Sequence, residues 1–203
     1  LPILVTIPLS FNIEPYFSYP MPGLSLRWYE NLLEDPNWVL ATKNTLIVGF
    51  ASAALATLLG VPAALGLAHR SLPYRETIMA LLISPMVVPV VIAAVGMYFF
   101  YTRLGLANNL LGLILAHGAL GTPFVVITVS ATLVGFNENL TRAARSLGAN
   151  PFLAFRRVKL PIIAPGVISG AIFAFATSFD EVVVVLFLGG VEQRTIPRQM
   201  WSG

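Results

Sequence analysis

Long apolar stretches alternate with short polar segments along the chain, and this pattern predicts membrane-spanning helices. Four apolar stretches lie at about Asn44–Ala68, Thr77–Tyr101, Leu110–Phe136 and Ile162–Leu188. Each is long enough to cross a bilayer, because a spanning helix needs about 20 residues. A shorter apolar run, Leu1–Phe11, has about half the length of a span, and we expect it to be the outer end of a first transmembrane helix.

Composition agrees with a membrane protein. The 203 residues are 57% hydrophobic and 10% charged, whereas soluble domains carry about 25% charged residues. We therefore expect an all-α membrane protein, a polytopic helical bundle with five spans wholly or partly present. Residues 1–203 are interpreted as a single transmembrane domain that is truncated at both ends. Cysteine is absent, which excludes disulfides and thiolate metal sites, and we expect no metal site.

Prolines and small residues predict the shape of the spans. Pro85 and Pro89 should bend the third span or free backbone carbonyls in it. Gly121-Thr122-Pro123 predicts a kink in the fourth span. In the second span, small residues at three- and four-residue spacings predict the close approach of a neighbouring helix: Gly49, Ala53, Ala56 and Gly60.

The densest basic cluster separates the last two apolar stretches and predicts the orientation of the chain. Cytoplasmic loops of membrane proteins carry an excess of Lys and Arg, so this cluster is expected inside, together with Arg70 and Arg75. The polar, aromatic segment 12–37 then lies outside, and its Arg27–Glu30 stretch predicts a short helix along the membrane surface. The cluster comprises Arg142, Arg145, Arg156, Arg157 and Lys159.

The basic loop between the last two spans predicts two short helices. Asn137 can cap the first helix, and Gly148 suits the left-handed residue that stops it. Asn150 can cap the second helix, with Pro151 at its first position, where the missing N–H costs nothing. Pro161 is expected to end this second helix.

Residues 137–161 also carry apolar side chains that suit a partner surface. The first helix has an apolar stripe, and in the second Phe152 and Phe155 fall three apart on one face. Two short helices with an aromatic knob fit a groove in a partner protein. A basic amphipathic segment can also rest on anionic lipid, and composition alone leaves both alternatives open.

Three residue pairs in this loop match a known pattern: Ala143-Ala144, Gly148-Ala149 and Leu160-Pro161. The pattern resembles the signature loop of inner-membrane permeases of binding-protein-dependent ABC importers, and the resemblance extends over nearly the whole chain. It implies a six-span permease fold, of which five spans are matched, and a cytoplasmic coupling loop that docks on an ATPase subunit. The coupling residues that it implies are Ala143, Ala144, Leu147, Gly148, Ala149, Phe152, Phe155, Arg156, Leu160 and Pro161.

The resemblance also implies a set of partners in the bacterial inner membrane. These are a cytoplasmic ATPase dimer, a second permease subunit, a periplasmic substrate-binding protein and membrane lipid, with no nucleic acid. We expect ATP and Mg²⁺ on the ATPase, no cofactor on this chain and no enzymatic activity in it, because the chain lacks a GxxxxGK[ST] pattern. At Arg142 the family usually has Glu, so the customary acidic contact to the ATPase is not expected here.

Two acids lie inside the last apolar stretch, Asp180 and Glu181, and each costs about 2.5–3.5 kcal/mol at a helix centre. On a continuous helix adjacent positions are about 100° apart, so both can border a pore without pointing squarely into it. We expect an acidic selector toward the periplasmic entry of a cation pathway. Thr177 and Ser178 are its expected polar neighbours.

The substrate is predicted from a second resemblance. Ser178-Phe179-Asp180-Glu181 resembles the Ser-x-Asp-Asp/Glu segment of the second permease of spermidine and putrescine importers, and Thr195-Ile196-Pro197 resembles the Leu-Pro segment that follows it there. Polyamines are therefore the implied substrates, and cationic amines suit acidic walls. Permeases for opines, amino-acid-like compounds or iron carry similar acids and are the alternatives. We expect Asp180→Asn to reduce ATP-dependent polyamine uptake and to leave assembly intact.

Other function classes fit the chain less well. The acids can instead pair with a partner permease, His117 or Arg103 for assembly. His117 with Asp180 would suit a proton-coupled secondary transporter, but a lone membrane His is more often a helix–helix hydrogen bond, and no convincing internal repeat supports that class. A membrane-embedded enzyme lacks any catalytic constellation in this sequence.

Overall fold

The computed structural model describes residues 2–16, 18–69 and 71–202. Within these ranges the chain is helical, and its extended segments form only an isolated bridge between Asn12 and Leu24. The helices that precede the basic loop are α1 (Pro2–Leu9), α2 (Arg27–Glu34), α3 (Pro36–Leu67), α4 (Arg75–Val87), α5 (Val90–Arg103) and α6 (Leu110–Val134). The remaining elements are α7 (Glu138–Ser146), α8 (Pro151–Ala154), the π-helix Phe155–Lys159, α9 (Leu160–Asp180), α10 (Val183–Leu188) and α11 (Ile196–Ser202).

Three helices in the described residues are long and apolar enough to cross a membrane. They cover Pro36–Leu67, Leu110–Val134 and Pro151–Asp180, and the bent pair α4–α5 makes a fourth span if it is counted as one. Three of the four long apolar stretches thus contain a helix of spanning length, and the remaining one, Thr77–Tyr101, corresponds to the bent pair. The run predicted as part of a first span forms the eight-residue helix α1, and Leu1 lies outside the described residues, as does Arg70 of the predicted inside loop.

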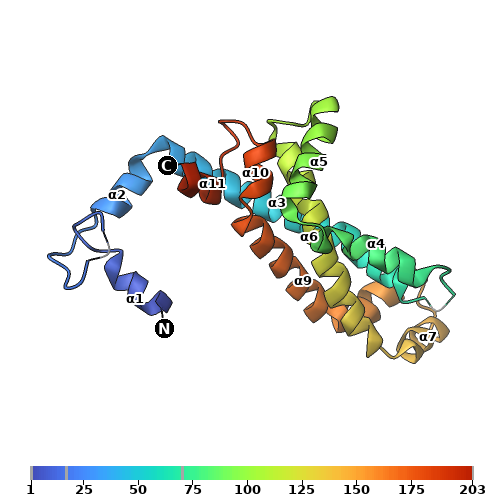
Figure 1. Cartoon of the computed structure of the whole chain (residues 1–203). Coiled ribbons are helices and arrows are strands. Elements are labelled where there is room, and N and C mark those ends of the chain that lie inside the picture. The colour runs from blue at the N-terminus through green and yellow to red at the C-terminus, as the bar shows by residue number, and fades with distance from the viewer. Residues whose placement is uncertain (1, 17, 70, 203) are drawn as a thin grey trace.

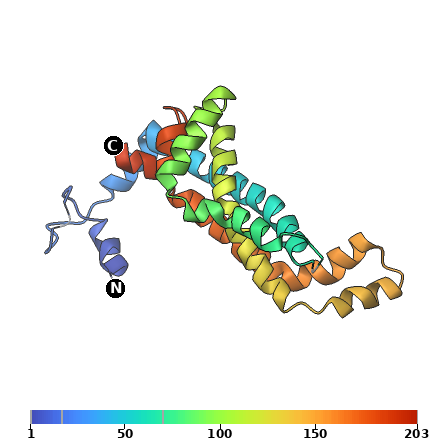
Figure 2. The same ribbon diagram turned by 45° about the vertical axis from the view of Figure 1, so that its right-hand side comes forward.

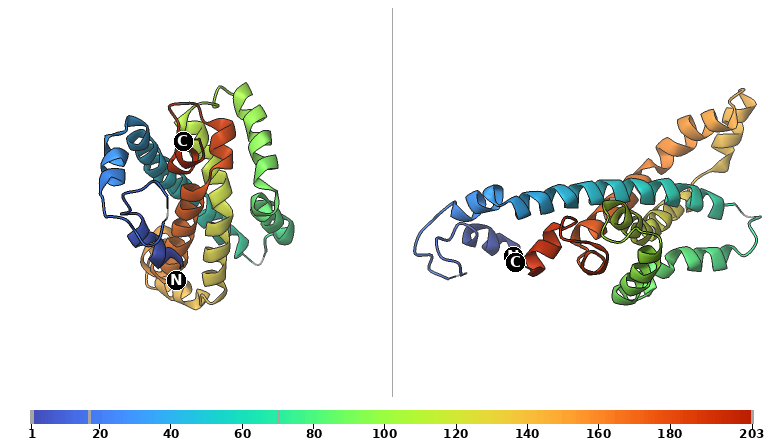
Figure 3. Two further views of the ribbon diagram at one scale, coloured as in Figure 1. Left: turned by 60° about the vertical axis from the view of Figure 1, so that its left-hand side comes forward. Right: turned by 90° about the horizontal axis from the view of Figure 1, so that it is seen from above.

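The long helices α3, α6 and α9 pack side by side, while α1 and α2 lie apart from them (Figure 1). The loop between α6 and α9 leaves the bundle as a pair of antiparallel helices (Figure 2). We call residues 137–159 the hairpin. Seen from above, the hairpin projects from one end of the molecule, and both chain termini lie toward the opposite end (Figure 3).

The second span begins earlier than its hydropathy indicated. Asp35 accepts the N–H of Asn37 with its side chain, and Pro36 occupies the first turn, so α3 starts at Pro36 rather than at Asn44. The first two turns of α3 mix the polar residues Asn37, Thr42 and Lys43 with apolar ones, so hydropathy did not mark them as part of the span. The short helix predicted at Arg27–Glu30 is confirmed as part of α2.

Small residues let the three long helices come close, as the second span predicted. A Cβ at Gly60 of α3 would lie 2.7 Å from the Cβ of Val125 on α6. A Cβ at Gly170 of α9 would lie 2.5 Å from Thr128 Oγ1, again on α6. The backbones of α3 and α9 therefore pack directly against α6, and a larger side chain at either position has no space.

The third span is bent sharply where its prolines predicted. The axes of α4 and α5 differ by 100° across a short break. Val88 and Pro89 at this break are extended, with ψ of 130° and 127°. Pro123 lies inside α6, which the structure assigns as one helix from Leu110 to Val134.

At the end of the bundle opposite the hairpin, the C-terminal segment is tied to α3. Asn44 donates to the carbonyls of Glu192 and Arg194 at 2.8 and 2.9 Å, and Thr45 Oγ1 accepts the N–H of Ile196 at 2.8 Å. These bonds fix the Thr195-Ile196-Pro197 stretch against the second span, although the two are about 150 residues apart in sequence.

Candidate functional site

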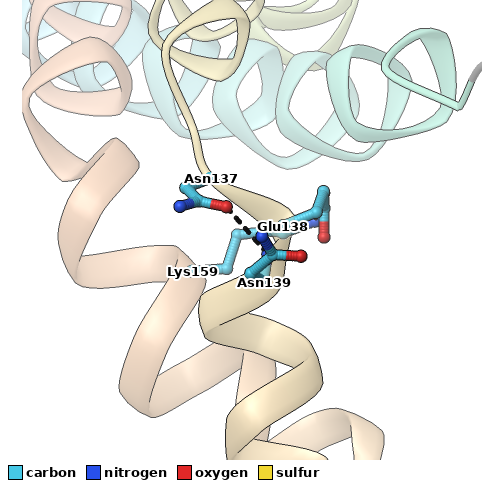
Figure 4. A network of polar contacts seen from close by, with 4 residues as sticks. All are labelled: Asn137, Glu138, Asn139 and Lys159. Carbon is cyan, nitrogen blue, oxygen red and sulfur yellow. Dashed lines mark hydrogen bonds and ion pairs between the residues drawn. The ribbon is translucent and has the colours of Figure 1, made fainter.

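The hairpin is closed at its base by polar contacts (Figure 4). Asn137 accepts the N–H of Asn139 at 3.0 Å and caps α7, as the sequence predicted. Glu138 follows at the first position of α7, and its Oε1 lies 2.6 Å from Lys159 Nζ at the other end of the hairpin. The same ammonium lies 5.0 Å from the ring centre of Phe136. These contacts hold the two ends of the hairpin together.

The tip of the hairpin is apolar and uncovered. Gly148 has φ +89° and ends the first helix, and Asn150 caps α8 by accepting the N–H of Leu153 at 2.8 Å, so both local predictions are confirmed. Leu147 is 89% exposed and Phe152 is 70% exposed. The caps thus build a compact turn that presents two large apolar side chains to the surroundings.

The second helix of the hairpin does not end at Pro161, so that prediction is wrong. Residues Phe155–Lys159 form a π-helix in which Leu160 donates its N–H to the carbonyl of Phe155. In a π-turn one backbone carbonyl has no N–H donor from the helix. Pro161, which follows the π-helix, has no N–H to donate, so the helix can continue through it. The chain therefore continues as one helical span over Pro151–Asp180.

The ten predicted coupling residues divide into an outer and an inner group. Phe155 is half-buried where the π-helix begins, and Leu160 packs against the core cluster that contains Val129 and Ile163. Half-buried with them are Ala144 and Ala149. The exposed members are Ala143, Leu147, Gly148, Phe152, Arg156 and Pro161.

The last apolar stretch is broken at its acids, contrary to the continuous helix that the sequence predicted over Ile162–Leu188. The helix α9 ends at Asp180, and Glu181 is extended with φ −75° and ψ 116°. Glu181 Oε1 accepts the N–H groups of Val183 at 2.7 Å and Val184 at 3.1 Å. The carboxylate thereby caps the start of α10 and stabilises the break. The 100° relation expected between the two acids does not apply, because they do not share a helix.

The two broken spans meet at a cleft of about 370 Å³. It is lined by residues 85–90 at the α4–α5 break, by Leu120 and Phe124 of α6, and by Thr177 and Glu181. Leu120 and Phe124 lie in the middle of the 25-residue helix α6, so the cleft is level with the middle of that span. Thr177 and Glu181 carry the polar side chains among these lining residues.

The other two predicted pathway residues lie outside the cleft lining. Asp180 is exposed, and Ser178 is buried, with its Oγ 2.8 Å from Nδ1 of His117. The prediction that His117 forms a helix–helix hydrogen bond is confirmed, and its partner is Ser178 rather than Asp180. In the described part of the chain, neither acid forms an ion pair with His117 or Arg103.

Residues 56–202 match the family described as binding-protein-dependent transport system inner membrane component. The chain belongs to this family. It is an ABC importer permease and a multi-pass protein of the bacterial inner membrane, as the resemblance of its basic loop implied. The matched residues include the α4–α5 break, the hairpin and the cleft.

Similar proteins include polyamine permeases. The spermidine/putrescine transport permease PotC of Haemophilus influenzae is 30% identical over 100% of this permease and 78% of its own length. The putrescine transport permease PotI of Escherichia coli is 30% identical over 99% of this chain and 74% of its own. A probable molybdenum ABC transporter permease of Haloferax volcanii is 32% identical over 79% of this chain and 62% of its own length.

A solved structure supports the fold. A chain of a bacterial ABC transporter involved in the import of the acidic polysaccharide alginate superimposes with a TM-score of 0.77 at 18% identity. The match covers 98% of the permease and 71% of that chain. The helical permease fold expected from the sequence is therefore confirmed.

The sequence connected α6 with the acids only through His117, and not through Leu120 and Phe124 of the cleft. Leu120 and Phe124 are four residues apart and therefore lie on one face of their helix. That spacing was visible, but an apolar pair within an apolar span does not indicate which face lines a cleft. The base contact between Glu138 and Lys159 was also missed, because it joins residues 21 positions apart across two helices.

Proposed function

We propose that the permease moves polyamines such as putrescine and spermidine into the cytoplasm, driven by a separate ATPase that acts through the hairpin. The observation that carries this proposal is the exposed apolar tip at Leu147 and Phe152. In this account ATP and Mg²⁺ bind to a cytoplasmic ATPase dimer. A second permease subunit completes the pathway, and a periplasmic binding protein delivers the substrate.

The length of the last span supports a protein partner for the tip. Its continuous helix has 30 residues, of which α9 takes 21, leaving nine in the hairpin. Since α-helices rise 1.5 Å per residue, α9 is about 31 Å long and the remaining nine residues extend about 14 Å further. The hydrocarbon core is about 30 Å thick. The hairpin therefore extends beyond a stretch of helix that is already as long as the hydrocarbon core is thick, which supports a protein groove as the surface that buries the apolar tip.

The cleft supports a cationic substrate. Glu181 provides the charged side chain among the lining residues, and Thr177 adds a hydroxyl. An ammonium group loses hydration when it enters the membrane, and a carboxylate returns part of that energy. Two relatives carry spermidine or putrescine in their names. We therefore assign Glu181 as the main selector, with Asp180 as an exposed acid beside the break.

Uptake by the reconstituted importer tests this assignment. The Glu181→Gln variant keeps an oxygen that can accept from Val183 and Val184 but removes the charge. We expect its ATP-dependent putrescine and spermidine uptake to fall about tenfold, the effect of losing about 1.4 kcal/mol of ammonium stabilisation. Asp180→Asn should reduce uptake less. Co-purification of all subunits checks that assembly is unchanged.

The same assay decides the substrate class. Putrescine and spermidine are tested beside opine-like compounds, amino acids and iron, each with the cognate binding protein. Unchanged amine uptake by Glu181→Gln would show that this carboxylate is not the selector. Uptake of another compound with no amine uptake would remove the polyamine assignment and leave the permease fold untouched.

A further inference from the structure

The hairpin carries a strong positive charge that the chain itself does not neutralise. Residues 137–159 contain one acid, Glu138, against five bases. Glu138 is paired with Lys159, and the four arginines are exposed. Within the described residues none of these guanidinium groups has an ion-pair partner. The unpaired set is Arg142, Arg145, Arg156 and Arg157.

The four arginines lie at two different distances from the base of the hairpin. The ion pair shows that Glu138 is level with Lys159, the last residue before α9. Arg156 and Arg157 lie within one turn of that level. Arg142 and Arg145 lie four and seven residues beyond Glu138 along α7, which is about 6 and 10 Å further along the hairpin.

Arg142 and Arg145 are three residues apart and therefore lie on one face of α7. They lie between the base of the hairpin and its apolar tip at Leu147 and Phe152, and all four side chains are exposed. The outer part of the hairpin is thus a surface with a cationic flank and an apolar end.

We infer that the groove receiving this surface has an acidic rim that pairs with Arg142 and Arg145, on the ATPase subunit of the same importer. The inference rests on the proposed function, because it assigns the chemistry of the partner that the hairpin engages. The apolar tip fills the groove, and the arginine pair selects a rim of opposite charge and sets the orientation of docking. Charge complementarity of this kind contributes specificity and a strong dependence on ionic strength.

Cross-linking in the complete importer tests the contact directly. In the Arg142→Lys variant a carbodiimide can join the new amine to a carboxylate within contact distance. We expect this variant to be cross-linked to an Asp or Glu of the ATPase, which mass spectrometry identifies. Arg103→Lys, at the end of α5, is the matched control and should give no ATPase product.

Charge reversal supplies the functional test. We expect Arg142→Glu to lower binding-protein-stimulated ATP hydrolysis about tenfold, as loss of a close charge pair does. Changing the cross-linked ATPase carboxylate to Lys should restore the rate. The assay is run in nanodiscs of neutral lipid and again with anionic lipid, and the same loss is expected in both.

Three outcomes would overturn the inference. These are no cross-link from Arg142→Lys to the ATPase, full activity of Arg142→Glu, or a loss that occurs only with anionic lipid, which would assign these arginines to headgroups. In each case the proposed function would still stand if the ATPase co-purifies with the wild-type permease and no longer co-purifies when Leu147→Ser and Phe152→Ser are introduced. Absence of any ATPase in the purified wild-type complex would instead remove the proposed function itself.

Discussion

At the scale of single residues, the permease uses polar side chains inside its spans to hold helices in specific places. Glu181 both caps α10 and charges the cleft. The hydrogen bond between His117 and Ser178 joins α6 to α9 within one turn of the break. Because both side chains are buried, this bond fixes the position of the residues that precede Glu181.

Removing that hydrogen bond separates a structural role from proton transfer. We expect Ser178→Ala to lower stability by about 0.6 kcal/mol, and at most about 1.7, the range measured for hydrogen bonds between membrane helices. Thermal unfolding in detergent measures this loss. Ser84→Ala is the control, since that hydroxyl bonds the carbonyl of Leu81 in its own helix. The pH profile of uptake should be unchanged, and a shifted profile would support a proton relay at His117.

Local signals made some residues predictable and others not. Asn137, Gly148 and Asn150 act on the backbone within three residues, so their capping roles follow from residue type. The break after Asp180 could not be predicted, because the valines that follow continue the apolar run. Whether an acid lines a cleft depends on a distant helix, and nothing in the neighbouring sequence encodes that.

At the scale of elements, helix packing and helix breaks have different origins. Glycines allow α3, α6 and α9 to approach one another closely. Two helix breaks, one between α4 and α5 and one after α9, interrupt the apolar stretches. The α4–α5 bend was predictable from two prolines, since each removes an N–H. Pro161 shows the limit of that rule, because the preceding π-helix lets the span continue. The prolines thus indicated where a helix is perturbed but not whether the helix ends there.

The contact between α6 and α9 predicts the effect of one added methyl group. Gly170→Ala would bring a Cβ within 2.5 Å of Thr128 Oγ1 and 2.8 Å of Val125 Cα, so the helices must separate. We expect a loss of about 1–3 kcal/mol, as for other overpacked cores, measured as a lower unfolding temperature.

Gly96→Ala is the matched control for that change. Gly96 is also in a helix, α5, but no atom lies within 4 Å of a Cβ built there. The control should unfold at the wild-type temperature or slightly above it, because alanine favours helices. Equal unfolding temperatures for the two variants would contradict direct backbone packing between α6 and α9.

At the scale of the whole molecule, the cleft and the hairpin, which is proposed to transmit the motion of the ATPase, lie in different parts of the bundle. The cleft lies level with the middle of α6, and the hairpin projects from one end of the bundle (Figure 2). The helix over Pro151–Asp180 runs from the hairpin to the residue before Glu181. A push on the hairpin can therefore reach the cleft through a single helix, with the π-turn as its one irregular point in the described residues.

The most direct test of this account is amine uptake into proteoliposomes that contain the permease, its partner subunits and the binding protein. We predict that labelled putrescine accumulates only when ATP is supplied on the hairpin side, that a protonophore leaves uptake unchanged, and that Leu147→Ser with Phe152→Ser abolishes it. Uptake that proceeds without ATP and disappears with the protonophore would contradict the account and indicate a proton-coupled transporter.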